Sequence, residues 1–311
     1  EKVELFLPAT QPGYYELDVL LEREGEVVAA GTMPLALVRG KPYLDSPFAS
    51  DGAISWLVAP EQFTLAASLM GKAGISWDRI SWGEAEPERG VFNWGKYDDS
   101  VDAQHEKGLK ISMTFHDAPA WAKKPGHKLP EPDAMYHFAY EAGKHFAGRI
   151  QAWEIWNEAD IGFSAAIDTP AQYAAVLKAA YLGFKSADPS VTVLIGSWTH
   201  LFKKFVNQVL ENDVEQYYDV FNFHNHVSKP SQFNISVVDK YKQLLKDYQI
   251  QKPMWLTEAG YAIPTNPELE FSPEDARAQA CFLVRSFVES IASGVDKHFY
   301  FVFPYYHYNV I

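Results

Sequence analysis

Two glutamates, a hundred positions apart, each follow a short apolar run that has the pattern of a buried strand. Glu158 closes the run AWEIWNE, and Glu258 closes the run PMWLTE. A carboxylate at the mouth of a buried strand loses hydration, so its placement there is unfavourable unless the group has a use. Two such groups can cleave a glycosidic bond, one by protonating the leaving oxygen and the other by trapping the sugar. The pair therefore predicts glycoside hydrolysis.

Short apolar strands alternate with amphipathic helices from about residue 48 onward. Strands are predicted at residues 53–58, 75–82, 110–116, 151–157, 191–197, 219–225, 254–258 and 297–303. Helices are predicted at residues 61–73, 97–107, 133–147, 170–187, 200–211, 236–248 and 273–293. Eight strands separated by helices favour an α/β fold with a closed parallel (β/α)8 or TIM barrel over an open sheet. Reacting groups in such barrels project from the carboxyl ends of the strands, which is where Glu158 and Glu258 lie.

The first part of the chain has a different pattern. Residues 1–45 include two alternating runs separated by REGE, which predicts a hairpin, and we interpret them as a small β-sandwich remnant followed by a linker. Residues 46–311 are predicted to form the catalytic barrel. No helical pattern follows the eighth strand, as though the last helix of the barrel were missing.

The overall composition excludes several classes of protein. A net charge of −13 argues against nucleic-acid binding, because contacts to phosphates need a basic surface. No run of residues predicts a membrane span or a signal peptide. The single cysteine, Cys281, lies in a helical pattern and is predicted to be a small buried apolar residue. A carbohydrate is therefore the expected partner, rather than a nucleic acid or a membrane, and the oligomeric state is left open.

Four segments together resemble the glycoside hydrolases of clan A, the retaining barrel enzymes, and family 39 and its neighbours most. WEIWNE and WLTEAGY carry the resemblance at the two glutamates. WDRISWGEAEPERGVFNWGKYD, residues 77–98, and SMTFHDAPAWA, residues 112–122, are similar to the second- and third-strand segments of family 39. The resemblance covers about residues 48–305. It implies hydrolysis of β-glycosides in oligo- or polysaccharides without a cofactor, and a secreted or periplasmic location.

The resemblance assigns roles to three of these residues, and the cost of burying an unpaired cation suggests a role for a fourth. Glu158 matches the acid/base and Glu258 the nucleophile, so Glu158 should hold a proton in an apolar setting beside tryptophans while Glu258 stays ionised. Asn157 matches the residue that hydrogen-bonds the 2-hydroxyl of the sugar. Arg79 is expected to pair with Glu258, with its neighbours Asp78 and Glu84 as alternative partners. In retaining enzymes the two carboxyl groups lie about 5–5.5 Å apart.

Histidines follow two of the predicted strands. His116 matches a histidine that contacts sugar in the clan. The sixth strand carries FNFHNHV, with His224 and His226, where the clan usually has His-x-Tyr and the tyrosine hydrogen-bonds the nucleophile. Either His226 replaces that donor or another residue does; Tyr261 and Tyr306 are the candidates. The three histidines also raise the alternative of a zinc site, although sugar contacts explain them without a metal.

Aromatic residues near the strand ends could stack on sugar rings. Four tryptophans are candidates for such platforms: Trp56, Trp82, Trp121 and Trp198. The eighth strand has no tryptophan, so Phe301 or Phe303 is expected to form the floor of the subsite where cleavage occurs. A basic cluster after the third strand, Lys123, Lys124, His127 and Lys128, could attract an anionic sugar, although a solvated loop is the commoner explanation.

Two other functions fit parts of the sequence. The first is a barrel that binds glycans without cleaving them, which the altered strand-six and strand-eight positions favour and the retained glutamate pair disfavours. The second is a metal-dependent hydrolase that uses the histidines, which a chelator would inhibit.

Overall fold

A computed structural model describes most of the chain. The described residues are 11–37, 46–71, 74–162, 168–199, 203–227, 235–261 and 272–303. Internal contacts divide the chain into two compact units, Glu1–Pro42 and Tyr43–Ile311, and each is described by itself.

The first unit contains an antiparallel hairpin. Strand β1 (Gly13–Arg23) pairs with β2 (Glu26–Leu37), with an irregularity between Leu21 and Glu22. The turn between them contains Glu24 and Gly25, both with positive φ (54° and 84°), a geometry that matches the twist of paired strands. The hairpin predicted around REGE is therefore present.

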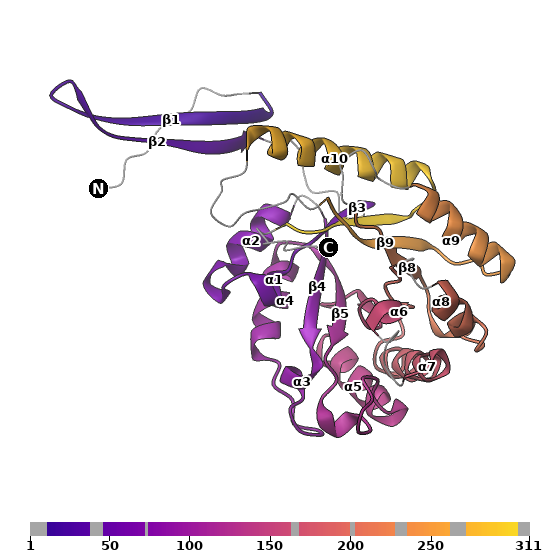
Figure 1. The fold of residues 1–311 in the computed structure, drawn as a ribbon. Helices are drawn as coiled ribbons and strands as arrows, with labels where there is room; N and C mark the ends of the chain where they lie inside the picture. Colours follow the sequence, from indigo (N-terminus) through magenta and orange to yellow (C-terminus); the bar gives the residue numbers. More distant parts are fainter. Residues whose placement is uncertain are drawn as a thin grey trace. The chain divides into compact units, whose positions relative to one another are not determined.

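The second unit is a nearly closed barrel of eight parallel strands, as predicted (Figure 1). The strands are β3 (Phe48–Asp51), β4 (Ile75–Ser81), β5 (Lys110–His116), β6 (Ala152–Glu154), β7 (Thr192–Leu194), β8 (Phe221–His224), β9 (Met254–Ala259) and β10 (Lys297–Tyr300). Their order is β7-β6-β5-β4-β3-β10-β9-β8. Isolated parallel bridges, Leu194 to Val220 and Trp198 to Phe223, join the β7 and β8 sides of the sheet.

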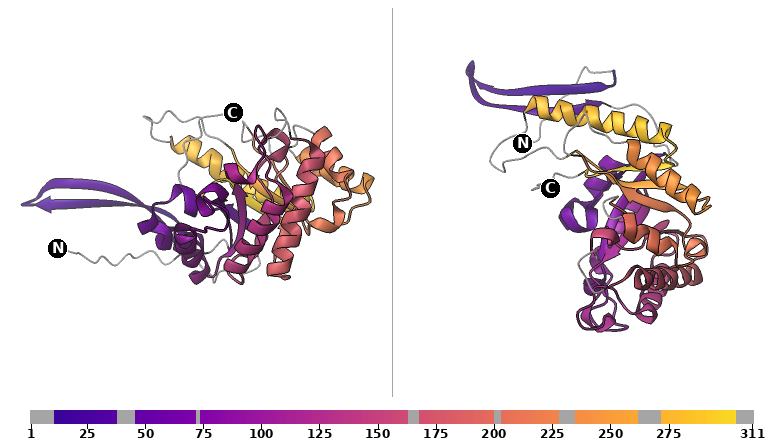
Figure 2. Two further views of the ribbon diagram at one scale, coloured as in Figure 1. Left: turned by 90° about the horizontal axis from the view of Figure 1, so that it is seen from below. Right: turned by 45° about the vertical axis from the view of Figure 1, so that its right-hand side comes forward.

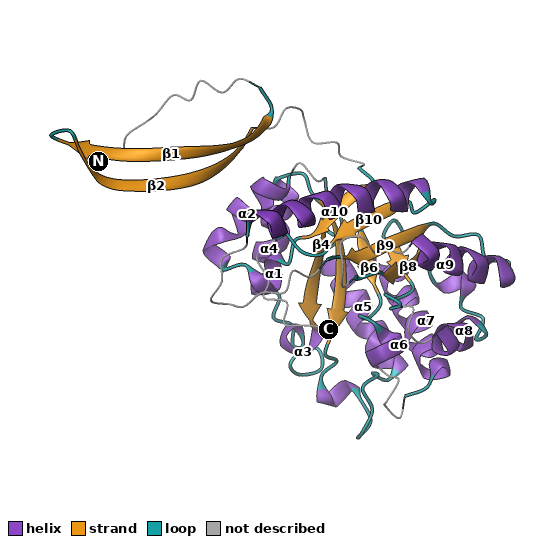
Figure 3. Cartoon of the chain, turned by 45° about the horizontal axis from the view of Figure 1, so that its top comes forward, coloured by secondary structure: helices purple, strands orange, loops and turns teal. Residues whose placement is uncertain are grey.

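Helices surround the sheet (Figures 2 and 3). They are α1 (Ile54–Leu57), α2 (Phe63–Met70), α3 (Trp82–Ala85), α4 (Gly95–Glu106), α5 (Pro132–His145), α6 (Ala159–Gly162), α7 (Pro170–Ala187), α8 (Lys203–Leu210), α9 (Ile235–Asp247) and α10 (Pro273–Ala292). Helices α7 and α10 begin at the predicted residues. The Thr169 and Ser272 side chains accept hydrogen bonds from backbone amides of the first turn, and a proline follows each of them.

The predicted first strand is wrong. Residues 53–58 were assigned to it, but β3 ends at Asp51 and residues 54–57 form α1. Ala53, with φ 46°, turns the chain out of the strand, and the Asp51 carboxylate accepts a hydrogen bond from its amide. The Asp78 carboxylate accepts from the amide of Ser55 and so satisfies a donor in the first turn of the helix. A short apolar run does not by itself distinguish a buried strand from a buried helix.

The barrel interior below the strand ends is apolar. Trp255 packs against one cluster that includes Trp77 and Phe299 and against a second that includes Leu194 and Val220. The first cluster comes from β3, β4 and β10 and the second from β6, β7 and the residue before β8, so Trp255, itself partly buried, packs between these two groups of strands. The polar side chains above it therefore lie in a layer close to the carboxyl ends of the strands.

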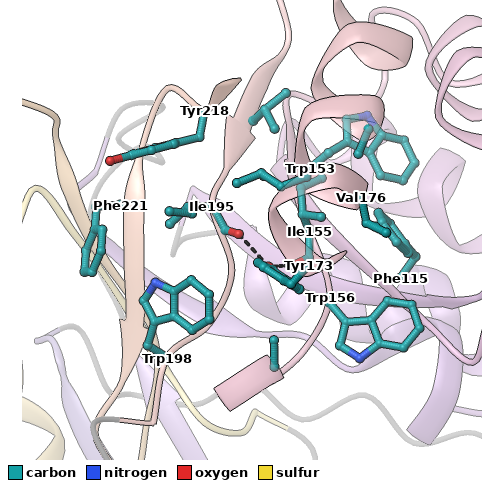
Figure 4. Packing of buried hydrophobic residues seen from close by; sticks show 14 of the residues in the cluster. Phe115, Trp153, Ile155, Trp156, Tyr173, Val176, Ile195, Trp198, Tyr218 and Phe221 are labelled. Atoms are coloured by element: carbon teal, nitrogen blue, oxygen red, sulfur yellow. Dashed lines mark hydrogen bonds between the residues drawn. The ribbon is translucent and has the colours of Figure 1, made fainter. Parts of the chain in front are cut away.

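A tyrosine of α7 secures the chain where β6 and β7 end (Figure 4). The Tyr173 hydroxyl lies 2.7 Å from the carbonyl oxygen of Ile155 and 2.6 Å from that of Ile195 and donates its one hydrogen to this pair. Tyr173 is fully buried, so its hydroxyl supplies a hydrogen-bond donor to these carbonyls where water does not reach. It thereby holds the segment that leads to Asn157 and Glu158.

Replacing Tyr173 with phenylalanine should therefore destabilise the barrel by about 1–3 kcal/mol, because two buried carbonyls lose a donor. The free energy of unfolding in urea measures this. Tyr181→Phe, on the same helix but only partly buried, is the matched control and should change stability by less than about 0.5 kcal/mol. Equal stability of the two variants would contradict the assigned role of the Tyr173 hydroxyl.

Candidate active site

Glu158 lies in a tight turn after β6. Trp156 and Glu158 both have positive φ values, 70° and 48°, which are unfavourable for residues with a side chain. The Ser197 hydroxyl oxygen accepts a hydrogen bond from the Glu158 amide at 2.9 Å and holds this turn against the β7 side of the barrel. The strained turn therefore directs the Glu158 side chain to a fixed position.

Glu258 lies within β9, and only 4% of the residue is exposed. Its Oε2 atom lies 3.2 Å from Nε2 of His226 and 3.6 Å from Nδ1 of His224. Its Oε1 atom lies 3.5 Å from an Nη2 atom of Arg79. One oxygen thus faces two imidazoles and the other faces a guanidinium.

The environment of Glu258 keeps it ionised. Burial alone would raise the pKa of this carboxyl, but the charges of His224 and Arg79 and the hydrogen bond from His226 outweigh burial and lower the pKa to about 2. A low pKa is the property that a carboxylate nucleophile requires. The geometry therefore agrees with the role that the resemblance assigns to Glu258.

His224 connects the two glutamates. Its Nδ1 atom lies 2.9 Å from Oε1 of Glu158 and also faces Glu258. Burial would lower the pKa of this imidazole, but the neighbouring Glu258 and Glu158 raise it to about 9. Glu158 therefore has a charged neighbour that was not predicted, in addition to any contact with tryptophans. Trp153 stacks on Phe184 with ring centroids 4.6 Å apart.

Four donor atoms meet at this point. One atom each from Glu158, His224, His226 and Glu258 lies within 4.8 Å of every other. His116 is not a member of this group among the described residues; its Nδ1 atom pairs with the carboxylate of Asp117. The three-histidine zinc site considered from the sequence is therefore not formed by the described side chains.

Arg79 is fixed between two indoles. Its guanidinium carbon lies 5.2 Å from the ring centroid of Trp56 and 5.0 Å from that of Trp77. Its Nη2 atom also reaches Oδ1 of Asn157 at 3.4 Å. The alternative partners are engaged elsewhere, because Asp78 accepts from Gln104 and Glu84 pairs with Lys96. Arg79 therefore links Asn157 to Glu258.

Two of the four predicted sugar platforms are wrong. Trp82 and Trp198 are fully buried, and Trp82 stacks on Phe138 with ring centroids 4.5 Å apart. Neither indole face can reach a sugar, because both lie in the layer between the sheet and the helices. Trp121 is partly buried, and its Nε1 atom donates to the carbonyl of Glu86 at 3.1 Å. The guanidinium of Arg79 lies over the ring of Trp56.

The remaining aromatic candidates differ in their contacts. Phe303 is 42% exposed, and its amide donates to the carbonyl of Asp51. Phe301 packs edge-on against His226, with centroids 5.4 Å apart. Tyr261 packs against Phe282, whereas the imidazole of His226 reaches the Glu258 carboxylate. Tyr306, the other candidate donor, lies outside the described residues.

Two of the four residues in the basic cluster after β5 have acidic partners. Lys124 pairs with Glu131 at 3.1 Å, and His127 pairs with the buried Asp168 at 2.8 Å. The backbone amide of Lys128 also donates to Asp168. Ion pairs of Lys124 and His127 therefore help to hold this loop.

The sequence analysis missed a second buried carboxyl below the site. Oε2 of Glu154 accepts a hydrogen bond from Asn222 at 2.7 Å, and the same Asn222 nitrogen lies 3.0 Å from Oγ1 of Thr257. Burial raises the pKa of Glu154 to about 7, because the loss of hydration outweighs the lowering by the charge of His224, and the nearby Glu258 raises it by a smaller amount. The alternation of WEIWNE, which puts Glu154 on the barrel side of β6 in the same register as Ala152, could have revealed it.

Glu154→Gln should make the protein more resistant to heat at pH 8 and change little at pH 4.5. The pKa of Glu154 is raised from 4.5 to about 7 on folding, so its contribution to stability is present below pH 4.5 and lost as pH rises through about 7. The loss is about 3 kcal/mol, which the amide does not suffer. Melting temperatures at the two pH values measure it, with the exposed Glu106→Gln as control. A glutamine variant that is less stable than wild type at pH 8 would contradict this.

His226→Phe should move the acid limb of kcat/KM to higher pH. The hydrogen bond and charge of His226 help to lower the pKa of Glu258, so their loss raises that pKa and protonates the carboxylate at a higher pH. The pH profile of kcat/KM in EDTA-containing buffer measures the shift. Tyr261→Phe is the matched control, and a shift in that variant alone would reassign the hydrogen-bond donor.

Comparisons with known proteins show which families and folds this chain is similar to. A family model described as Beta-galactosidase, that of glycoside hydrolase family 42, matches residues 56–133, about a quarter of the chain. A family 39 glycoside hydrolase from the gut symbiont Bacteroides cellulosilyticus WH2 has a similar structure, with a TM-score of 0.72 and 20% identity over 94% of this chain and 64% of that one.

Two further solved structures share the fold at lower similarity. The exo-beta-1,4-mannosidase Op5Man5 from Opitutaceae bacterium strain TAV5 has a TM-score of 0.62 and 16% identity, covering 82% of this chain and 50% of that one. Xylanase 10B from Thermotoga petrophila RKU-1, solved with xylobiose, has a TM-score of 0.59 and 17% identity, covering 82% and 81%. The chain thus spans between half and two thirds of the length of the first two proteins.

These similarities confirm the predicted resemblance to clan A and the predicted barrel fold. The family match and the fold together support a glycosidase.

No helix within the described ranges is both long and apolar enough to cross a membrane.

Proposed function

We propose that this protein is a retaining β-glycoside hydrolase that acts on oligo- or polysaccharides by double displacement. The observation that carries the proposal is the close approach of the two glutamates, which each offer an oxygen within 4.8 Å of the other. This separation suits a retaining enzyme, whose carboxyl groups lie about 5–5.5 Å apart, whereas an inverting enzyme needs about 6.5–9.5 Å to admit a water molecule.

In the first step Glu258 attacks the anomeric carbon and Glu158 protonates the departing oxygen. A carboxylate oxygen forms the new bond to carbon, and the bond from carbon to the leaving oxygen breaks. In the second step Glu158 removes a proton from water, which displaces Glu258 and frees the sugar. Glu158 ends this step protonated, ready for the next cycle.

The surrounding residues support this chemistry. Arg79 and His226 hold the nucleophile and keep it ionised, while Asn157, fixed by Arg79, is suited to hydrogen-bond a sugar hydroxyl. His224, between the carboxyl groups, can hydrogen-bond Glu158 as that group becomes an anion and Glu258 loses its charge. All of these groups belong to the chain, so the proposed reaction requires no cofactor.

The family description and the printed names of the similar structures refer to galactosides, mannosides and xylan. A β-linked sugar in the pyranose form is the common feature, and we propose that class as the substrate. Polymers of this kind lie outside the cytoplasm, which is consistent with a secreted or periplasmic protein.

Proton NMR during hydrolysis tests this proposal. A panel of aryl β-glycosides, followed by xylan, mannan and galactan, is incubated with the protein, and the anomer released first is recorded. The β-anomer is expected, because two displacements restore the configuration. First release of the α-anomer would contradict a retaining mechanism. Binding of these glycans without any release of sugar would instead indicate a carbohydrate-binding barrel.

A further inference from the structure

The four side chains at the centre of the site provide a donor set that suits a transition metal. We propose that Glu158, His224, His226 and Glu258 bind Zn²⁺, and that the bound ion blocks the two glutamates. Metal binding follows from the geometry alone, whereas the inhibition rests on the proposed function. The site contributes nothing to the reaction itself in this scheme; it makes the protein sensitive to zinc.

The distances between the donor atoms fit a tetrahedral site. Zinc lies about 2.0–2.2 Å from nitrogen and oxygen ligands, so the ligands of a tetrahedral site lie roughly 3.4 Å from one another. Nδ1 of His224 lies 2.9 Å from Glu158 and 3.6 Å from Glu258, and Nε2 of His226 lies 3.2 Å from the same Glu258 oxygen. Since all four atoms lie within 4.8 Å of one another, small side-chain rotations suffice to complete the site.

The types of donor select the metal. Two imidazoles and two carboxylates suit zinc and its transition-metal neighbours, whereas Ca²⁺ and Mg²⁺ prefer six or more oxygen ligands. Oε2 of Glu258 faces both histidines, so this oxygen can bind the ion together with them while Oε1 keeps its contact with Arg79. Two carboxylates also neutralise the charge of the ion.

The site is accessible from one side and rigid on the other. The side chains of Glu158 and His226 are 24% and 20% exposed, while those of His224 and Glu258 are nearly fully buried. The His226 ring lies against Gly260, where an added Cβ would be 3.4 Å from Nδ1, and against Phe301. An ion can therefore enter past Glu158 and His226 and meet ligands whose directions are already set.

His226 distinguishes this chain from the clan pattern in this respect. A tyrosine at this position would offer a phenol in place of an imidazole nitrogen, and only one histidine would remain in the group. The second imidazole thus has a consequence that the hydrolytic reaction does not require. Zinc affinity should depend on His226.

Calorimetry with ZnCl₂ on EDTA-treated and then desalted protein tests the binding. One ion per chain is expected for wild type, and Co²⁺ should give the intense visible absorption of a tetrahedral site. His226→Phe should weaken zinc binding by at least about a hundredfold, because even the loss of an outer-shell partner costs 10–100-fold. His116→Phe is the matched control and should keep the wild-type affinity, since His116 lies outside the group.

Three outcomes would overturn the metal site. They are the absence of zinc binding at millimolar concentration, equal weakening by His116→Phe and His226→Phe, and binding that survives the loss of both His226 and Glu258. Circular dichroism confirms that each variant is folded. MgCl₂ in place of ZnCl₂ should give no binding heat, and tight Mg²⁺ binding would also contradict the assigned donor set.

Hydrolysis assays separate this inference from the proposed function. With a substrate that the protein cleaves, zinc should inhibit wild type at the concentrations that saturate binding, and EDTA should restore full activity. Full activity with zinc bound would overturn the blocked pair. Activation of the EDTA-treated protein by zinc would leave the metal site standing and overturn the metal-free double displacement. Hydrolysis that is unaffected by EDTA, in a protein that binds no zinc, would support the metal-free double displacement and overturn the metal site.

Discussion

Glu258→Gln is expected to lower kcat/KM by about 10⁵-fold, the order of loss seen when a nucleophile is removed from a cooperating set of groups. Glutamine keeps the shape of the side chain but cannot form a stable bond to the anomeric carbon. The loss should be similar for good and poor leaving groups, because the attack itself is removed. Initial rates with an activated aryl β-glycoside measure it.

A control and a rescue accompany this substitution. Glu106→Gln removes an exposed glutamate from α4 and should leave kcat/KM unchanged. Glu258→Gly with added azide should regain activity and release an α-glycosyl azide, because the small anion attacks from the position of the missing carboxylate. Activity of Glu258→Gln within tenfold of wild type would assign the nucleophile to another residue.

The sequence predicts the pair Glu158 and Glu258 because two independent patterns coincide at each residue, a strand-like apolar run and the sequence context of clan A. Glu258 ends a strand-like run, and its sequence context matches the seventh strand of clan A. The structure places it within β9 and brings it next to Glu158, although β6 ends at Glu154 and a strained turn supplies the remaining reach. The sequence predicted which residues meet. It did not predict the turn, because positive φ at Trp156 and Glu158 has no signature in residue type.

The partner of Glu258 depended on orientation, which spacing does not determine. His226 and Tyr261 both follow barrel strands and were both candidate donors. His226 reaches the carboxylate from the end of β8 and packs beside Gly260, where a Cβ would lie 2.6 Å from the carbonyl oxygen of Phe301 and 3.4 Å from the imidazole. This packing involves three strands, and no local pattern reveals it.

Predictions of burial were the least successful. Trp82 and Trp198 are near strand ends, as predicted, but they point outward into the helical layer and are fully buried. Cys281 was predicted to be buried and is exposed on α10. A strand end offers both an inward and an outward direction, and a helix offers a full turn of directions. A shift of one residue along the strand or helix changes the direction in which a side chain points. Residue type alone therefore does not predict which of these side chains are buried.

Glu158→Gln should have an effect that depends on the leaving group. General acid catalysis contributes about 10²–10⁴-fold, so kcat/KM for a disaccharide should fall by about 10³-fold. A dinitrophenyl glycoside, whose leaving group needs no proton, should lose less than about tenfold. The same variant lacks the base of the second step, so kcat on the activated substrate should fall more than kcat/KM.

Azide separates this role from a structural one. The anion needs no general base, so it should raise kcat of Glu158→Gln on the dinitrophenyl glycoside and release a β-glycosyl azide, whereas wild type should not respond. Glu61→Gln, at an exposed position, is the control for the loss of one carboxylate. A loss that is equal for both leaving groups and insensitive to azide would mean that Glu158 only binds substrate. The acid would then have to be sought elsewhere among the groups around His224.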